Sequence, residues 1–232
     1  YDTAQRIKSS NKKGPFEQTI EKYGIPNRTF KHCTSKLKTL PMEHYLKHTL
    51  GWGSDYDTAI GIRSDEIDRL SVEAKRRRLI YPLVTDIPTT KKQVNSWWER
   101  QSFRLQLKGY EGNCAWCWKK TFRKHMALLT DDSTLYDFPE RMEREHGMVG
   151  PEFKKRAIGN NPIEDDYVRT FFRERMSVQD LKEELKRTGP VEYPDDHIPT
   201  EIFDPRLDVN GGCEESCEVY GYDDDDDLED VL

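Results

Sequence analysis

The chain has 232 residues, of which 34% are hydrophobic and 34% are charged, and its formal net charge is -6. This length and apolar content suffice for one sizeable core, so we expect one folded domain with appendages. No run of about 18 apolar residues could span a bilayer, and the first residues lack the charged-then-apolar pattern of a secretory leader. We therefore expect a cytoplasmic protein without a membrane partner.

The charges are unevenly distributed along the chain. From Pro190 to Leu232 there are 16 acidic residues and one basic residue, Arg206, whereas residues 1–189 carry a net charge of +9. A basic body of this kind is suited to an anionic ligand or to nucleic acid. The acidic segment has the composition of a disordered, solubilising tail.

The first half of the sequence indicates helices followed by strands. Residues 14–26 predict a short helix that ends at a Gly-Ile-Pro sequence. Pro41 suits the first turn of a second helix, whose apolar face would contain Met42, Tyr45, Leu46 and Leu50. Residues 56–62 alternate between apolar and polar or small side chains and predict a strand, and residues 78–84 predict another. This order of elements favours a layered α/β fold with a parallel sheet.

The second half is predicted to be mainly helical. Thr90 and Gln93 form a capping box that opens a helix, and we expect Trp97 and Trp98 on that helix to lie in the core. Two further helices are predicted. The first covers residues 116–129, with Phe122, Met126 and Leu129 inward, and the second lies around Leu135, Phe138 and Met142. A last helix is predicted to begin at the Ser177 cap and to end before Gly189-Pro190; its inward residues would be Val178, Leu181 and Leu185.

Two cysteines lie three residues apart in the sequence GNCAWCWKK, as Cys114 and Cys117. In a reducing compartment this spacing favours a metal, cluster or redox site over a disulfide, although cysteines also pack as small hydrophobic residues. The predicted helix start and the adjacent lysines would favour thiolates. A closed thiolate site needs four ligands, and Cys33 is the first further candidate. Cys213 and Cys217 lie in the acidic tail and are weaker candidates.

Three stretches occur in an order that resembles the phosphoadenosine phosphosulfate reductase family, especially its short phage and bacterial reductase-like members. They are HCTSKLKTLP, IGIRSDE and GNCAWCWKK, and the resemblance runs from about Gly14 to Asp131. It implies the Rossmann-like fold of the adenine nucleotide alpha-hydrolase-like (PP-loop) group, a parallel sheet flanked by helices. Residues 1–150 would then be the C-terminal part of such a domain, truncated at its start, followed by a helical extension (151–189) and the tail (190–232).

The resemblance also implies cofactor and substrate residues. Cys33, Cys114 and Cys117 match positions that hold a four-iron four-sulfur cluster, whereas Thr34 stands where the family has a second adjacent cysteine. A three-cysteine cluster is the better match, with His32 as a fourth ligand and zinc as the alternative metal. Lys38, Gly61 and Arg63 match positions that bind an adenine nucleotide or a sulfonucleotide.

An arginine just after a strand also lies where open α/β sheets bind ligands, and its planar fork suits phosphate or sulfate. The alternative is an ion pair between Arg63 and Asp65 or Glu66. The family's phosphate loop and its C-terminal E-C-G-x-H segment are both absent from this sequence.

These patterns lead to two hypotheses about function. The first is an adenine-nucleotide-dependent sulfur-chemistry enzyme, either a sulfonucleotide reductase or a sulfurtransferase, with an iron-sulfur cluster. The second is a non-catalytic binding protein of viral type, in which the cysteines hold zinc and the chain engages nucleic acid or a basic protein partner.

Overall fold

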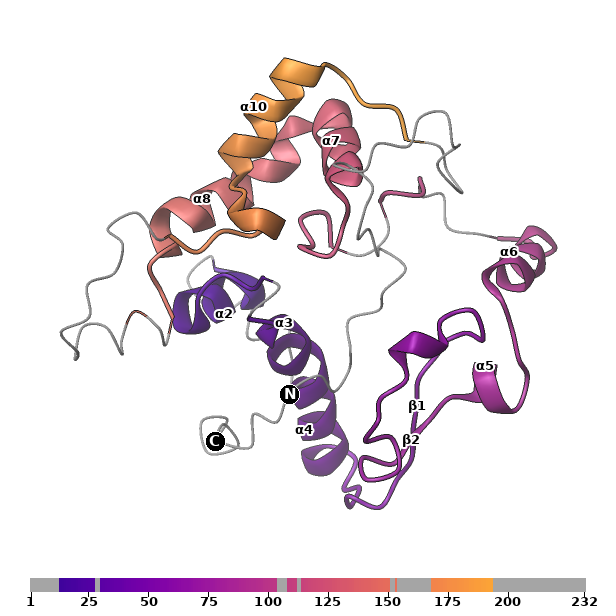
Figure 1. Ribbon diagram of the computed structural model, residues 1–232. Helices are drawn as coiled ribbons and strands as arrows, with labels where there is room; N and C mark the ends of the chain where they lie inside the picture. Colours follow the sequence, from indigo (N-terminus) through magenta and orange to yellow (C-terminus); the bar gives the residue numbers. More distant parts are fainter. Residues whose placement is uncertain are drawn as a thin grey trace. The chain divides into compact units, whose positions relative to one another are not determined.

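The computed structural model describes residues 13–27, 30–103, 108–111, 114–150, 153 and 168–193. Within these residues the protein is rich in helices and contains a small two-stranded parallel sheet (Figure 1). The described residues divide into two compact units. Unit 1 contains those up to Leu37 and those from Lys108 onward, and unit 2 contains Lys38 to Phe103. No helix among them is long and apolar enough to cross a membrane. The predicted tail (190–232) lies outside the described residues from residue 194 onward.

Unit 1 is built from helices that pack around one core. Helix α10 contacts α7 and α8, and α8 contacts both η3 and α2. Their bounds are α2 (Pro15–Tyr23), α3 (His32–Thr34), α7 (Phe122–Asp131), η3 (Ser133–Tyr136), α8 (Asp137–His146), η4 (Arg173–Arg175) and α10 (Val178–Thr188).

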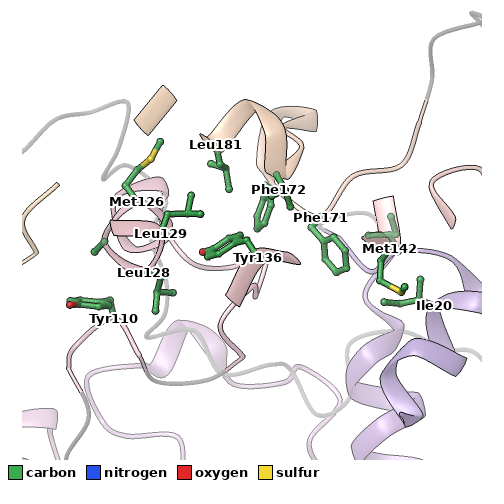
Figure 2. Close-up of a cluster of buried hydrophobic side chains, with 13 residues drawn as sticks. Ile20, Tyr110, Met126, Leu128, Leu129, Tyr136, Met142, Phe171, Phe172 and Leu181 are labelled. Atoms are coloured by element: carbon green, nitrogen blue, oxygen red, sulfur yellow. The ribbon is translucent and has the colours of Figure 1, made fainter. Parts of the chain in front are cut away.

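The core of unit 1 contains most of the apolar residues that the helical spacing places inward (Figure 2). Ile20 of α2, Met126 of α7, Met142 of α8 and Leu181 of α10 are fully buried. The aromatic side chains Tyr110, Tyr136, Phe171 and Phe172 belong to the same buried cluster. The predicted inward faces of α7 and α10 are therefore confirmed, whereas Leu135 is 40% exposed.

Local capping signals account for several helix ends. The Ser177 hydroxyl accepts a hydrogen bond from the amide of Asp180, whose carboxylate accepts one from the Ser177 amide, so α10 opens with a capping box. This helix ends at Gly189, whose φ of 78° lies in the left-handed region that glycine adopts readily. Helix α2 ends in the same way at Gly24, with φ of 85°. These predicted ends are confirmed because they depend only on neighbouring residues.

Unit 2 contains a small sheet and several short helices. Strand β1 (Thr58–Ala59) pairs in parallel with β2 (Leu79–Ile80), with Thr58 opposite Leu79. The other elements are α4 (Leu40–His48), η2 (Ile67–Arg69), α5 (Pro82–Thr85) and α6 (Lys91–Glu99), and the π-helical η1 (Ser35–Thr39) crosses from unit 1 into unit 2. The core of unit 2 consists of Ile62, Leu79 and Tyr81.

Three sequence predictions for unit 2 need correction. Both strands are two residues long, and Pro82 starts helix α5 instead of continuing β2, because proline has no amide to donate to a sheet. The capping box at Thr90 is confirmed, but Trp97 and Trp98 are 48% and 38% exposed. Helix α6 contributes no residue to the small core of unit 2, so its tryptophans remain at the surface. The predicted inward residues of α4 include Met42, Tyr45 and Leu50, which are also exposed.

Candidate functional site

The Cys114–Cys117 segment forms a tight turn in unit 1. The amide of Cys117 donates to the carbonyl oxygen of Cys114 at 3.1 Å, and the amide of Lys120 donates to the carbonyl oxygen of Cys117 at 2.9 Å. A hydrogen bond between residues three apart closes a β-turn, which brings the first and last residues within about 7 Å of each other. Cys114 is exposed and Cys117 is half-buried. The turn can therefore present two sulfur atoms to one ligand.

The turn precedes helix α7 instead of starting it, which corrects the sequence prediction. Thr121 is the N-cap, and its side chain accepts a hydrogen bond from the amide of Lys124, so the helix begins at Phe122. Cys117 lies outside the first helical turn, within which the helix-dipole effect falls off. The dipole is thus a weak source of thiolate stabilisation here.

Cationic side chains fix the backbone on both sides of the turn. Arg173 donates from Nε to the carbonyl oxygen of Trp118 at 3.2 Å and from Nη2 to that of Lys119 at 3.1 Å. Lys120, which is 1% exposed, donates from Nζ to the carbonyl oxygen of Tyr110 at 2.7 Å. These contacts place positive charge next to the cysteine pair, and positive charge favours thiolates.

A buried histidine that the sequence reasoning did not select lies beneath the turn. His125 Nδ1 is 2.7 Å from the hydroxyl of Tyr136. The ring lies near the carbonyl of Cys117, although its Nε2 makes no hydrogen bond of good geometry among the described residues. Burial, with the positive charge of Lys120, lowers the pKa of His125 to about 3, so the imidazole is neutral at pH 7.

Tyr136 completes this buried pair. Its pKa is raised, first by burial and then by the negative charge that Cys114 can carry, so the phenol stays protonated. The signal for His125 in the sequence is its position eight residues after Cys117, on the buried face of α7. His125 and Tyr136 thus form a buried hydrogen-bonded pair.

The third predicted cysteine ligand lies in a different part of unit 1. Cys33 belongs to the short helix α3 and is half-buried. Within the described ranges, no three side chains of His, Cys, Asp or Glu come together in a way that could hold a metal ion. Cys33, Cys114 and Cys117 are thus not assembled as one ligand set there. The turn fits a soft metal as a ligand pair and not as a complete site.

His32 has the protonation state that a metal ligand needs. Its pKa is lowered to about 4, first by burial and then by the charge of Arg169. Its ring centroid lies 5.8 Å from that of Tyr23, and its Nε2 makes no hydrogen bond among the described residues. The imidazole is therefore neutral, and it is half-buried beside Cys33.

The predicted anion-binding residues all lie in unit 2. Arg63 contacts two carboxylates, Asp65 from Nε at 3.0 Å and Glu66 from Nη2 at 3.2 Å. Asp65 also accepts a hydrogen bond from the amide of Lys91 at the start of α6. Arg63 thus adopts the ion-paired arrangement that was the alternative to anion binding. Lys38 and Gly61 are exposed.

Comparison with known proteins found a relative in Escherichia phage lambda, an uncharacterized nin region protein, ORF290. It is 30% identical over 208 residues, which cover 89% of this chain and 64% of the relative. The chain therefore spans about two thirds of the length of this curated relative. No family model matches the chain, and no solved structure matches it.

Proposed function

We propose that this chain is part of a sulfur-chemistry protein of the phosphoadenosine phosphosulfate reductase type, in which Cys114 and Cys117 provide two ligands of an iron-sulfur cluster. The observation that carries the proposal is the hydrogen-bonded Cys114–Cys117 turn, with Lys120 and Arg173 donating to backbone carbonyl oxygens before and after it. Sulfur ligands in a positively charged setting suit iron and sulfide. When bound, the cluster would supply a redox or Lewis-acid centre for chemistry on a sulfur atom.

Cys33 is the third ligand in this proposal because it lies in the same unit as the turn. Binding must bring α3 and the turn together, and His32 is the neutral group beside Cys33 that could complete the set. A Rossmann-like sheet is the fold that we propose for the complete domain. The parallel β1–β2 pair supports it, since parallel pairs belong to layered α/β folds. The similarity to a phage protein supports an association with phage.

The substrate in this proposal is an adenine nucleotide or a sulfonucleotide bound near Lys38, Gly61 and Arg63. Its anionic group would displace the carboxylates of Asp65 and Glu66 from the guanidinium of Arg63. Arg63→Ala should weaken nucleotide binding by about 1.5 to 3 kcal/mol, the scale of a lost hydrogen bond to a charged group. Isothermal titration alongside thermal melts measures this. Unchanged affinity with a large fall in melting temperature would make Arg63 a structural ion-pair residue.

The cysteine assignment is tested by metal analysis of variants purified without oxygen. Cys114→Ser, Cys117→Ser and Cys33→Ser should each lose bound metal and lower stability, because metal binding contributes to folding. Cys213→Ser and Cys217→Ser are the matched controls and should keep the metal content of the unaltered protein. Equal loss of metal in the two control variants would refute the ligand assignment.

A further inference from the structure

Unit 2 contains a pocket that the proposed function does not use. It has a volume of about 510 Å³, within the usual range of ligand sites. The loop between α4 and β1 forms one wall, and the segment leading into β2 forms another. The sheet brings these two segments together, because the Thr58 amide donates to the carbonyl oxygen of Arg78 at 2.8 Å.

One wall of the pocket carries an aromatic pair. The rings of Trp52 and Tyr56 lie 5.8 Å apart at an interplanar angle of 61°. Trp52 is 51% exposed, so a large part of its indole faces solvent at the pocket. An exposed indole that is held by an edge-on neighbour offers a flat surface on which a nucleobase can stack.

The lining of the pocket is basic. Lys47 of α4 and the consecutive residues Arg76, Arg77 and Arg78 line it, and Glu43 of α4 is the one acidic residue among the described residues that do so. Burial raises the pKa of Glu43, and its single negative charge is outnumbered by four positive ones. The lining therefore has a net positive charge, which suits phosphate groups.

The acidic partners of Arg76 and Arg78 are exchangeable. Arg76 contacts Glu73 at 2.7 Å, and Arg78 contacts Asp55 and, at 2.9 Å, Asp57. The side chains of Arg76 and Arg78 are 60% and 44% exposed, whereas that of Arg77, which contacts Glu73 at 2.9 Å, is 19% exposed. The exposed ion pairs of Arg76 and Arg78 contribute little and are screened by salt, so a phosphate can replace the carboxylates.

We propose that this pocket binds single-stranded nucleic acid, with an unpaired base on Trp52 and the flanking phosphates on Lys47 and the arginines at 76–78. In a duplex the faces of the bases are stacked on one another and are not accessible to the indole. An unpaired base of any kind has a free face that can stack on it. Four cations around one aromatic surface can contact more than one phosphate, which favours a strand over a mononucleotide. The net charge of +9 on residues 1–189 agrees with an anionic polymer as the ligand. The proposal is independent of the cysteines, since all these residues lie in unit 2.

Fluorescence anisotropy with the full chain and a labelled oligothymidylate of about 12 nucleotides tests the proposal. Trp52→Ala should weaken binding by about 5- to 150-fold, the effect of losing one stacked base. Trp52→Phe keeps an aromatic face and should retain most of the affinity. Arg76→Gln should reduce the slope of log affinity against log salt by about 0.7, the value for one phosphate contact on a single strand.

Trp97→Ala is the matched control, because Trp97 is an equally exposed tryptophan of unit 2 outside this pocket. It should leave the affinity unchanged, and circular dichroism should show the same helical content for all variants. An equal loss of affinity in Trp97→Ala, equal binding of the matching duplex, or equal competition by thymidine monophosphate would each overturn the proposal.

Discussion

Glu143 should make the packing of α10 on α8 depend on pH. Its carboxylate accepts hydrogen bonds from the amides of Phe171 at 3.0 Å and of Val178, the first residue of α10, at 2.8 Å. Burial nevertheless raises the pKa of Glu143 to about 7, and the nearby acidic residues Asp180 and Glu140 act in the same direction. The folded state therefore binds this proton more tightly than the unfolded chain does, where the pKa is about 4.5.

The sign of the effect follows from proton linkage. Between pH 4.5 and 7 the folded state holds more protons at this site than the unfolded state, so Glu143 lowers stability as the pH rises through this window. A shift of about 2.5 pKa units corresponds to about 3 kcal/mol at 1.36 kcal/mol per unit. Glu143→Gln cannot ionise, but its Nε2 cannot accept one of the two amide hydrogen bonds, which adds a cost that does not depend on pH. Between pH 4.5 and pH 8 the free energy of opening of the variant, relative to that of the unaltered protein, should therefore rise by about 3 kcal/mol.

Hydrogen exchange measured by mass spectrometry on peptides from α10 gives the free energy of opening at each pH. The difference between the unaltered protein and Glu143→Gln isolates this site from other titrating groups. Glu145→Gln is the matched control, because it removes an exposed carboxylate from the same helix. A difference between Glu143→Gln and the unaltered protein that stays constant from pH 4.5 to pH 8 would show that the two amide hydrogen bonds keep Glu143 ionised and would refute the reasoning.

Two further predictions concern the core of unit 1. Met126 is fully buried and Met148 is 63% exposed, so Met126→Ala should lower the free energy of unfolding by about 2 to 5 kcal/mol and Met148→Ala by less than about 0.5 kcal/mol, as urea titrations would measure. A similar effect of both substitutions would contradict the placement of α7. Stability should also fall as the pH drops from 6.5 toward 3, because the folded pKa of His125 is about 3 and the unfolded chain takes up the proton first. His125→Gln should reduce this slope, and an unchanged slope would show that His125 is accessible to protons.

The sequence predicted those features of the fold that depend on neighbouring residues. The capping boxes at Thr90 and Ser177 and the glycine end of α2 are local hydrogen-bond patterns, and all three are confirmed. The inward faces of α7 and α10 were predicted because helical periodicity places residues such as Met126 and Leu181 on one side.

Features that depend on long-range packing could not be predicted in the same way. Trp97 and Trp98 are of a residue type that is usually buried, yet both are exposed. Whether a helix packs against a core depends on contacts between segments that are distant in the sequence. The pocket that Trp52 and Arg78 line from two segments depends on the register of β1 against β2. Whether Cys33 reaches the cysteine turn depends in the same way on how α3 packs, which the spacing of cysteines along the chain does not specify.

The identity of the group that binds at the Cys114–Cys117 turn tests the proposed function most directly. The protein should be purified without oxygen, and its iron, acid-labile sulfide and zinc should be measured per chain. The account predicts brown protein that contains iron and sulfide and that loses both in Cys114→Ser and Cys117→Ser. Colourless protein that carries one zinc ion per chain, or no metal at all, would contradict it.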